Sequence, residues 1–324
     1  MSGYTSTAPR ERPTHLMAIA PSRASEADRS RAVGAGLCAV SAAGFATLSV
    51  FGKIGLASGM TLAGMLSLRF AGAAVVLGLG LVLARKIPSG LNLRTTATLL
   101  AMGMFGYGVQ STFYFLGLSR LPASVSALLL YVYPLFVALY DRVLNHRPLH
   151  GIEQLSLALA LVGVPLTVRP SAGEGLQLDP IGLGFVLASA AWYAGYIIAS
   201  DRVVRKVGAW ASTAWISFGA AIAFTLGGLA TRSLDWRLEG QQVWLLLGLI
   251  VFSTILPLTT FLAGVARLGP TLASIVSTLE PVFTAALAAL VLRESLAPLQ
   301  VVGGMLILSA ALLVHWPRKT SGQG

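Results

Sequence analysis

The sequence predicts an all-α integral membrane protein whose ten transmembrane helices form two inverted five-helix repeats around a central cavity. Three observations predict this fold. First, 55% of the 324 residues are hydrophobic and only 11% are charged, whereas soluble domains carry about 25% charged residues. Second, long apolar segments alternate with short polar connections. Third, two parts of the chain match each other at a nearly constant offset.

Ten segments are expected to span the membrane, because a helix needs about 20 apolar residues to cross the hydrocarbon core. They are approximately 32–52, 61–84, 96–118, 122–140, 150–169, 180–200, 210–230, 242–263, 270–292 and 297–316. Residues 1–31 are polar, basic and rich in Pro and Ser, so they are expected to form a disordered cytoplasmic tail. Residues 317–324 are expected to form a second cytoplasmic tail.

The distribution of Lys and Arg predicts the orientation of the chain. With the N-terminus in the cytoplasm, the inner segments hold 16 Lys and Arg residues and the outer loops hold 6. Positive residues accumulate on the cytoplasmic side, so we expect a multi-pass inner (plasma) membrane protein with both termini in the cytoplasm. The net charge of +11 is then a topology signal. No nucleic-acid partner is expected, because aromatic and basic residues do not interleave.

An internal repeat relates the two halves of the chain. The matching stretches, at offsets of 147 and 148 residues, are 117–136 with 264–283 and 32–45 with 180–193. Each half holds five predicted spans, and an odd number makes the second half enter from the opposite face. The sequence therefore predicts two inverted repeats, 32–169 and 180–316, a recurring design of transporters with a site at the repeat interface.

Four stretches give the chain a specific resemblance. They are LSLRF at 66–70, YVYPLF at 131–136, STLEPVF at 277–283 and LVLRESLAPLQVVGGMLIL at 290–308. With them the chain resembles a ten-helix, EamA-type member of the drug/metabolite transporter superfamily. The resemblance implies a cavity lined mainly by spans other than the fifth and tenth, alternating access, and export of amino acids or other small metabolites. One departure is Arg147, where relatives often carry a glutamate.

Glu280 is a carboxylate in the middle of a predicted span, about 15 Å into the segment 270–292. A charge at that depth costs at least about 2.5–3.5 kcal/mol, so it is expected to face a partner or a wet cavity. Pro281 follows at once and leaves the carbonyl of Ser277 without its helical donor. Two interpretations stay open. Glu280 caps this kink or pairs with a neighbouring helix, or it lines a cavity and binds an ammonium group or a proton.

Arg69 is the second charge inside a predicted span, about 12 Å into the segment 61–84. That segment runs inward and 270–292 runs outward, so Arg69 and Glu280 are expected at similar depth, and an ion pair between them is one interpretation. The other is that Arg69 snorkels to the interface or clamps backbone carbonyls. Lys53, at the end of the first span, is interpreted as an interfacial anchor.

Two predicted spans carry polar or aromatic faces at helical spacing. Segment 96–118 has Tyr107, Gln110, Ser111 and Tyr114, and segment 180–200 has Ser189, Trp192 and Tyr196 with Tyr193 beside them. These faces either bond to other helices or line a cavity, where aromatic rings can hold an ammonium group. The candidate substrate-binding residues are therefore Tyr107, Gln110, Ser111, Tyr114, Trp192, Tyr196 and Glu280.

Other chemistry is not indicated by the sequence. The four histidines lack metal-ligand spacing, and no phosphate-binding loop of the G-x-x-x-x-G-K-[ST] type is present. An intramembrane enzyme would need a nucleophile and a base at one depth, and Cys38 has no base near it in the sequence. We therefore expect no metal, no cofactor and no enzymatic activity.

The function expected from these features is secondary transport. The protein is expected to export a small polar metabolite, above all an amino acid, with or without proton coupling through Glu280, as a monomer or a homodimer. Efflux of cationic drugs is the alternative within the same class. A nucleotide sugar is disfavoured, because its phosphates would require several Lys or Arg inside the membrane and only Arg69 is there. A channel-like or regulatory membrane protein is the alternative from another class.

Overall fold

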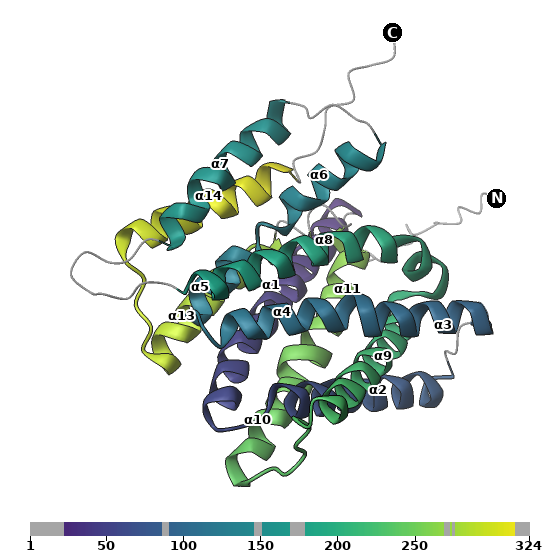
Figure 1. Cartoon of the computed structure of the whole chain (residues 1–324). Coiled ribbons are helices and arrows are strands. Elements are labelled where there is room, and N and C mark those ends of the chain that lie inside the picture. The colour runs from purple at the N-terminus through teal and green to yellow at the C-terminus, as the bar shows by residue number, and fades with distance from the viewer. Residues whose placement is uncertain are drawn as a thin grey trace, which may run out of the picture.

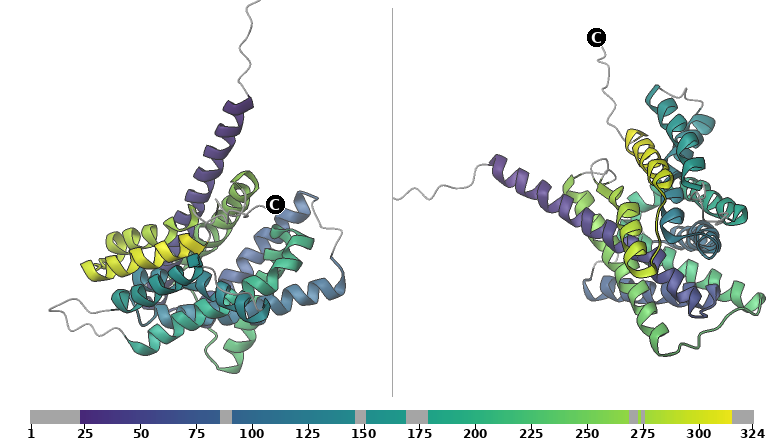
Figure 2. Two further views of the ribbon diagram at one scale, coloured as in Figure 1. Left: turned by 90° about the horizontal axis from the view of Figure 1, so that it is seen from above. Right: turned by 90° about the vertical axis from the view of Figure 1, so that its left-hand side faces the viewer.

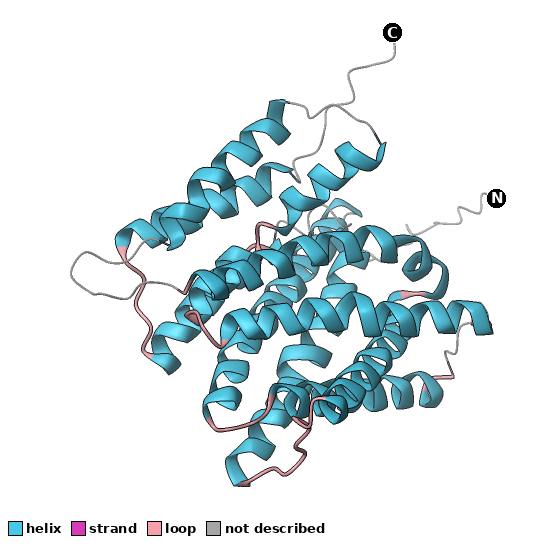
Figure 3. Ribbon diagram, in the orientation of Figure 1, coloured by secondary structure: helices cyan, strands magenta, loops and turns pink. Residues whose placement is uncertain are grey.

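The computed structural model describes residues 23–85, 91–145, 151–168, 179–268, 273 and 276–314. Over these ranges every regular element is a helix, and no strand occurs among them (Figure 3). This confirms the predicted all-helical class. The predicted tail residues 1–22 and 317–324, and Arg147, lie outside the described residues.

The first half of the chain consists of helices, one of which is long and interrupted by a π-helix (Figure 1). Its elements are α1 (Arg23–Ala57), α2 (Leu62–Leu83), α3 (Leu93–Ala101), the π-helix η1 (Met102–Tyr107), α4 (Gly108–Leu118), α5 (Ala123–Leu130), α6 (Tyr133–Asn145) and α7 (Gly151–Val168). The elements α3, η1 and α4 follow one another without a break. They cover the predicted segment 96–118.

The second half follows the same order of long and interrupted helices. Its elements are α8 (Pro180–Val207), α9 (Ala209–Ala230), α10 (Gly240–Ile250), the π-helix η2 (Val251–Ile255), α11 (Leu256–Leu268), α13 (Leu279–Leu287), the π-helix η3 (Ala288–Leu292) and α14 (Pro298–Val314). Helix α14 packs against α7, and the pair lies at one edge of the bundle (Figure 1).

Helix α1 begins earlier than the sequence predicted. It starts at Arg23, so residues 23–31, which were expected to be part of a disordered tail, are helical. Ala, Glu and Arg in this stretch favour helix, and the apolar helix that follows supplies the nucleus on which it can extend. Figure 2 shows this end of α1 projecting away from the bundle.

Length and apolarity single out the helices that can cross a bilayer. Among the described residues, five helical stretches are long and apolar enough by themselves: Arg29–Ala57, Leu62–Leu83, Pro180–Ala199, Trp210–Ala230 and Gly240–Val265. Shorter apolar helices accompany them, including Gln154–Thr167 and Pro298–Ala310. The chain is thus a multi-pass membrane protein, as the composition predicted.

Two helices are broken just before a proline. Tyr131 and Val132 form a turn between α5 and α6 ahead of Pro134, and Thr278 forms a turn ahead of Pro281. Proline lacks the N–H that would bond to the carbonyl four residues earlier, so the preceding turn loosens. The kink predicted at Pro281 is therefore present, and a second break lies at the corresponding place in the first half.

Close helix contacts depend on glycines in both halves. A side-chain carbon at Gly34 of α1 would lie 2.9 Å from Arg267 and Leu268 of α11, and one at Gly182 of α8 would lie 2.8 Å from Arg120. The backbones of these helix pairs can approach because the contact positions carry small residues. This packing fixes α1 against α11 and α8 against α4, the helices that surround the site.

Candidate functional site

A cavity of ≈310 Å³ lies between the helices of both halves. Its lining comes from α1, α2, η1, α4, α5, α6, α8, α9, η2, α11 and α13, together with Tyr131 and Ser277 at the two helix breaks. Among the described residues, α7 and α14 contribute no lining side chain. The resemblance implied this arrangement, because α7 and α14 occupy the fifth and tenth predicted segments.

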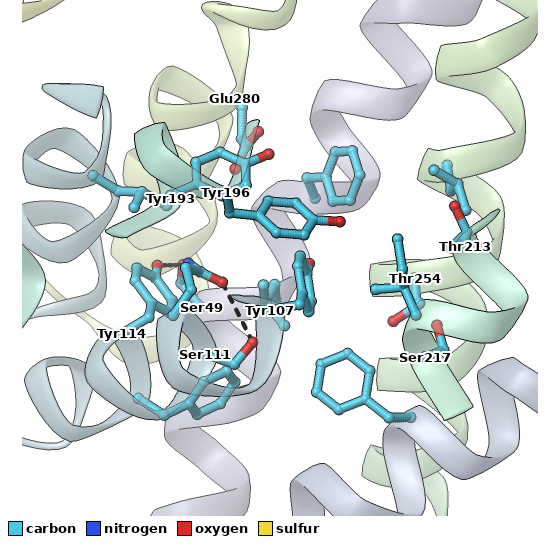
Figure 4. Close-up of a pocket in the computed structure, with 18 of the residues that line it drawn as sticks. Ser49, Tyr107, Ser111, Tyr114, Tyr193, Tyr196, Thr213, Ser217, Thr254 and Glu280 are labelled. Carbon is cyan, nitrogen blue, oxygen red and sulfur yellow. Dashed lines mark hydrogen bonds between the residues drawn. The ribbon is translucent and has the colours of Figure 1, made fainter. Parts of the chain in front are cut away.

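Most of the residues predicted for the site face this cavity. Those in the lining are Tyr107, Gln110, Ser111, Tyr114, Tyr196, Glu280 and also Arg69. The structure therefore brings together side chains from four segments that are distant in the sequence. Figure 4 shows several of them around a shared space.

Trp192 is the exception among the predicted residues. Its side chain does not line the cavity, and the residue is 45% exposed. Its indole N–H donates to the carbonyls of Phe105 and Gly106, at 3.0 and 3.1 Å. These carbonyls belong to η1, so Trp192 braces the π-helical turn from outside. The next residue, Tyr193, faces the cavity in its place.

Five tyrosines form a continuous run of ring contacts along the cavity, which we call the tyrosine ladder. The ring-centroid distances are 5.8 Å for Tyr107–Tyr196, 6.1 Å for Tyr196–Tyr193, 5.0 Å for Tyr193–Tyr133 and 6.0 Å for Tyr133–Tyr131. Such rings offer electron-rich faces that attract cations and stack on flat ligands. Tyr131 and Tyr133 were missed as site residues, although the YVYPLF stretch and its proline are the signals that could have found them.

Gln110 and Tyr114 hold helices together while they line the cavity. The Gln110 amide donates to the Ser189 hydroxyl at 3.1 Å, and that hydroxyl donates to the Gln110 carbonyl at 3.0 Å. The Tyr114 and Ser49 hydroxyls are 2.6 Å apart, which joins α4 to α1. The two interpretations of the 96–118 face, cavity lining and helix-to-helix bonding, are therefore both realised.

Glu280 lies at one end of the tyrosine ladder. The Tyr131 hydroxyl donates to the Ser277 carbonyl at 2.6 Å and to Glu280 Oε2 at 3.0 Å, so one proton is shared between two acceptors. The carbonyl that Pro281 leaves without a helical partner is thus satisfied by Tyr131, from the turn between α5 and α6. Glu280 is not needed as a cap for the kink, and its carboxylate lines the cavity.

Arg69 lines the same cavity but does not pair with Glu280. The residue is only 2% exposed, its Nε donates to the Thr254 hydroxyl at 3.0 Å, and its guanidinium lies 4.8 Å from the centre of the Phe70 ring. The ion pair proposed from the sequence is absent. In the described part of the chain, the ion pairs are Lys53–Glu294 and Arg120–Asp179.

A second polar cluster, which we call the Glu294 clamp, joins the segment after η3 to the start of α5. Glu294 accepts hydrogen bonds from the Ala123 N–H (2.8 Å), the Ser124 N–H (3.1 Å) and the Ser124 hydroxyl (2.9 Å), so it caps the first turn of α5. Lys53 lies 3.5 Å from Glu294 and donates to the Leu121 carbonyl at 2.5 Å. Lys53, interpreted from the sequence as an interfacial anchor, is thus bound to Glu294 and to the Leu121 carbonyl.

The part of the site that the structure describes holds no arrangement suited to a metal. Among the described residues, no three or more His, Cys, Asp or Glu side chains gather where they could ligate an ion. In the described lining, the polar groups that face the cavity are instead one carboxylate, one guanidinium, an amide and several hydroxyls. Such groups bind small polar molecules by hydrogen bonds and charge.

Comparison with known proteins gives a consistent result. The EamA-like transporter family matches residues 32–169 and 180–316. An uncharacterized transporter of Bacillus subtilis, YcbK, is 30% identical over 209 residues, which cover 62% of this chain and 66% of that protein. The threonine/homoserine exporter RhtA of Escherichia coli K12 is 26% identical over 215 residues, covering 66% of this chain and 69% of that protein.

These matches are partial in length. The alignments with YcbK and with a Synechocystis transporter span about two thirds of those relatives, 66% and 64%. A solved crystal structure shares the fold over more of the chain, with a TM-score of 0.57 at 18% identity, covering 88% of this chain and 96% of that one.

Proposed function

This chain belongs to the EamA-like transporter family, and on that premise we propose that it is a secondary transporter that exports amino acids. The observation that carries the proposal is the cavity, in which a carboxylate, a guanidinium and the tyrosine ladder face one space inside a membrane bundle. Charges at such depth are costly and usually mark a substrate or ion pathway. The similarity to an exporter named for threonine and homoserine supports the same substrate class.

Alternating access between two inverted repeats is the transport mode that we propose. Three pairs of features that match at the repeat offsets support it. Gly34 packs on Arg267 and Leu268 as Gly182 packs on Arg120 and Leu121, the helix breaks precede Pro134 and Pro281, and η1 and η2 interrupt corresponding rods. In this proposal ten spans surround the cavity, and both termini lie in the cytoplasm of a cell with the protein in its inner membrane.

Glu280 is the residue that we assign to the transport step. It is the carboxylate in the cavity lining, and it sits beside a helix break where small movements cost little. Tyr131 already donates to the Ser277 carbonyl, so a protonated Glu280 can donate to the Tyr131 oxygen in return. Glu280 can therefore exchange a proton or a substrate ammonium group without leaving a broken hydrogen bond.

Efflux of cationic drugs is the second candidate function. The tyrosine ladder ending at Glu280 is an arrangement that also suits an organic cation, because ring faces and a carboxylate both attract positive charge. The buried Arg69 in the same cavity counts against a purely cationic substrate. We therefore place amino acids first.

Counterflow in proteoliposomes tests the proposal. Proteoliposomes that contain either the wild type or Glu280→Gln would be tested with a panel of labelled amino acids. Saturable exchange would be measured at two pH values. We expect the wild type to exchange at least one amino acid and the variant to lose exchange or its pH dependence. Exchange of quaternary ammonium compounds without any amino acid would favour the cationic alternative. Normal exchange by Glu280→Gln would move the transport step elsewhere in the cavity.

A further inference from the structure

We propose that Arg69, with the hydroxyls of Thr254 and Ser217, forms an anion subsite that binds the carboxylate of the exported molecule. This subsite is separate from Glu280. The inference rests on the proposed transport function and deepens it, because it limits the substrates to carboxylate-bearing molecules. Arg69, Thr254 and Ser217 all belong to the cavity lining.

The positive charge of Arg69 is not compensated by a carboxylate of the described residues. Arg69 is 2% exposed, and among the described residues no carboxylate lies within the 4 Å that defines an ion pair with it. A buried cation usually has an ionic partner, since burial removes the water that stabilises it. Its side-chain neighbours here are neutral: the Thr254 hydroxyl, the Phe70 ring and Tyr107. A substrate anion would supply the missing negative charge.

The guanidinium of Arg69 is held in a fixed orientation by groups that do not neutralise its charge. The Thr254 hydroxyl donates a hydrogen bond to the Leu249 carbonyl at 2.9 Å, so its oxygen is oriented to accept a hydrogen bond from Arg69 Nε. Phe70 lies against the guanidinium and is itself stacked on Phe224, with centroids 5.8 Å apart and planes at 6°. A planar guanidinium fixed in this way is suited to grip a carboxylate through two parallel N–H bonds.

The backbone around Thr254 is π-helical. Thr254 lies in η2, and its side-chain bond to Leu249 spans five residues, the spacing of a π-helical turn. Such turns frequently occur at functional sites, where they redirect a side chain. Figure 4 shows Thr213, Ser217 and Thr254 on one side of the Tyr107 and Tyr196 rings and Glu280 on the other. In this view the three hydroxyl-bearing residues lie away from the carboxylate, and Thr254 among them accepts the hydrogen bond from Arg69.

The chemical class of the anion follows from the charge available. Among the described residues that line the cavity, Arg69 is the one Lys or Arg. A single guanidinium matches the single charge of a carboxylate, whereas phosphate groups carry more charge and are typically held by several basic groups or a helix N-terminus. We therefore assign the subsite to a carboxylate and expect substrates in which it is blocked to bind poorly.

The experiment compares threonine with threonine amide, which lacks the carboxylate. Exchange of each is measured in proteoliposomes, and the shift in melting temperature that each causes is measured on the detergent-solubilised protein. The variants are Arg69→Gln and Thr254→Val, with Arg120→Gln as a control because Arg120 pairs with Asp179 on the surface. Hydrogen bonds to charged groups are worth about 1.5–3 kcal/mol, so we expect Arg69→Gln to raise the KM for threonine about 10- to 100-fold.

Each outcome decides between the proposals. Preference for threonine over its amide in the wild type and in Arg120→Gln, lost in Arg69→Gln, supports the subsite. An unchanged preference in Arg69→Gln overturns it. If that variant does not fold, Thr254→Val decides: it should raise the KM for threonine while exchange of the amide stays the same, and an unchanged KM overturns the subsite. A melting shift with threonine alone but no exchange would keep the subsite and reject transport. Neither shift nor exchange would reject both.

Discussion

The cavity and the Glu294 clamp hold their charged side chains in opposite ways. In the clamp, Glu294 accepts three hydrogen bonds and faces Lys53 at 3.5 Å, so each charge has its counterpart within the protein. In the cavity, Arg69 and Glu280 face the same space without pairing with each other. Charges of the first kind join helices together. In the function that we propose, charges of the second kind are available to a ligand.

The same contrast separates two glutamates that lie close together in the sequence. Glu280 and Glu294 both belong to the last predicted repeat, and both interrupt apolar stretches. Only the partners that they meet distinguish them: the N-terminus of α5 for Glu294, and one tyrosine hydroxyl beside an open cavity for Glu280. We expect the substitution of each to affect a different property of the protein.

The largest loss of stability is expected for Glu294→Gln. An amide at this position would keep one acceptor oxygen, would turn its NH2 group toward the N–H donor of either Ala123 or Ser124, and would lose the attraction to Lys53. Because the clamp is partly exposed, we expect a cost of about 1–2 kcal/mol. The measurement is thermal unfolding in detergent. Asp179→Asn is the control.

The control variant, Asp179→Asn, changes a carboxylate at the surface. Arg120 and two backbone N–H groups lower the pKa of Asp179, whose side chain is partly exposed at the surface. Any stability from this pair is present above the ordinary pKa of Asp and is lost as the pH falls through the lowered value. At neutral pH we expect Asp179→Asn to change the melting temperature less than Glu294→Gln does. Equal shifts would contradict the distinction between the clamp and a surface pair.

An intermediate effect is expected for Tyr131→Phe. This change removes the hydroxyl that satisfies the Ser277 carbonyl and reaches Glu280, so it should cost about 1 kcal/mol and slow exchange. Tyr140→Phe is a matched control, because its hydroxyl donates to the Ala191 carbonyl at 3.1 Å and does not line the cavity. Both variants should lose similar stability, while only Tyr131→Phe should lose transport. Equal transport in the two variants would place Tyr131 outside the transport step.

The smallest loss of stability is expected for Glu280→Gln. The amide keeps an acceptor for Tyr131 and removes a charge from a site where charge is costly, so we expect stability to change by less than about 0.5 kcal/mol. The thermal scan used for Glu294→Gln measures this. A loss of stability as large as that of Glu294→Gln would show that Glu280 is a structural carboxylate. It would contradict the distinction between the cavity and the clamp.

The site residues show how far helical spacing can be trusted. The i, i+3, i+4, i+7 face of the 96–118 segment was predicted as a unit, and its four residues do line one cavity. The similar face with Trp192 and Tyr196 does not line the cavity as a unit, because Tyr193 and Tyr196 line it whereas Trp192 bonds to carbonyls of η1. Spacing identifies which residues share a face, but the rotation of a helix depends on its neighbours.

The sequence by itself determined the helical membrane class, the positions of most helices and the kink at Pro281, because hydrophobic length and a missing N–H act locally. Depth along a helix also follows from counting residues, which is why Arg69 and Glu280 stood out. Only the tertiary structure decided that these two charges do not pair, that Tyr131 satisfies Ser277, and that Lys53 meets Glu294. Each of these depends on which helices are neighbours, and that is fixed by packing between residues far apart in the chain.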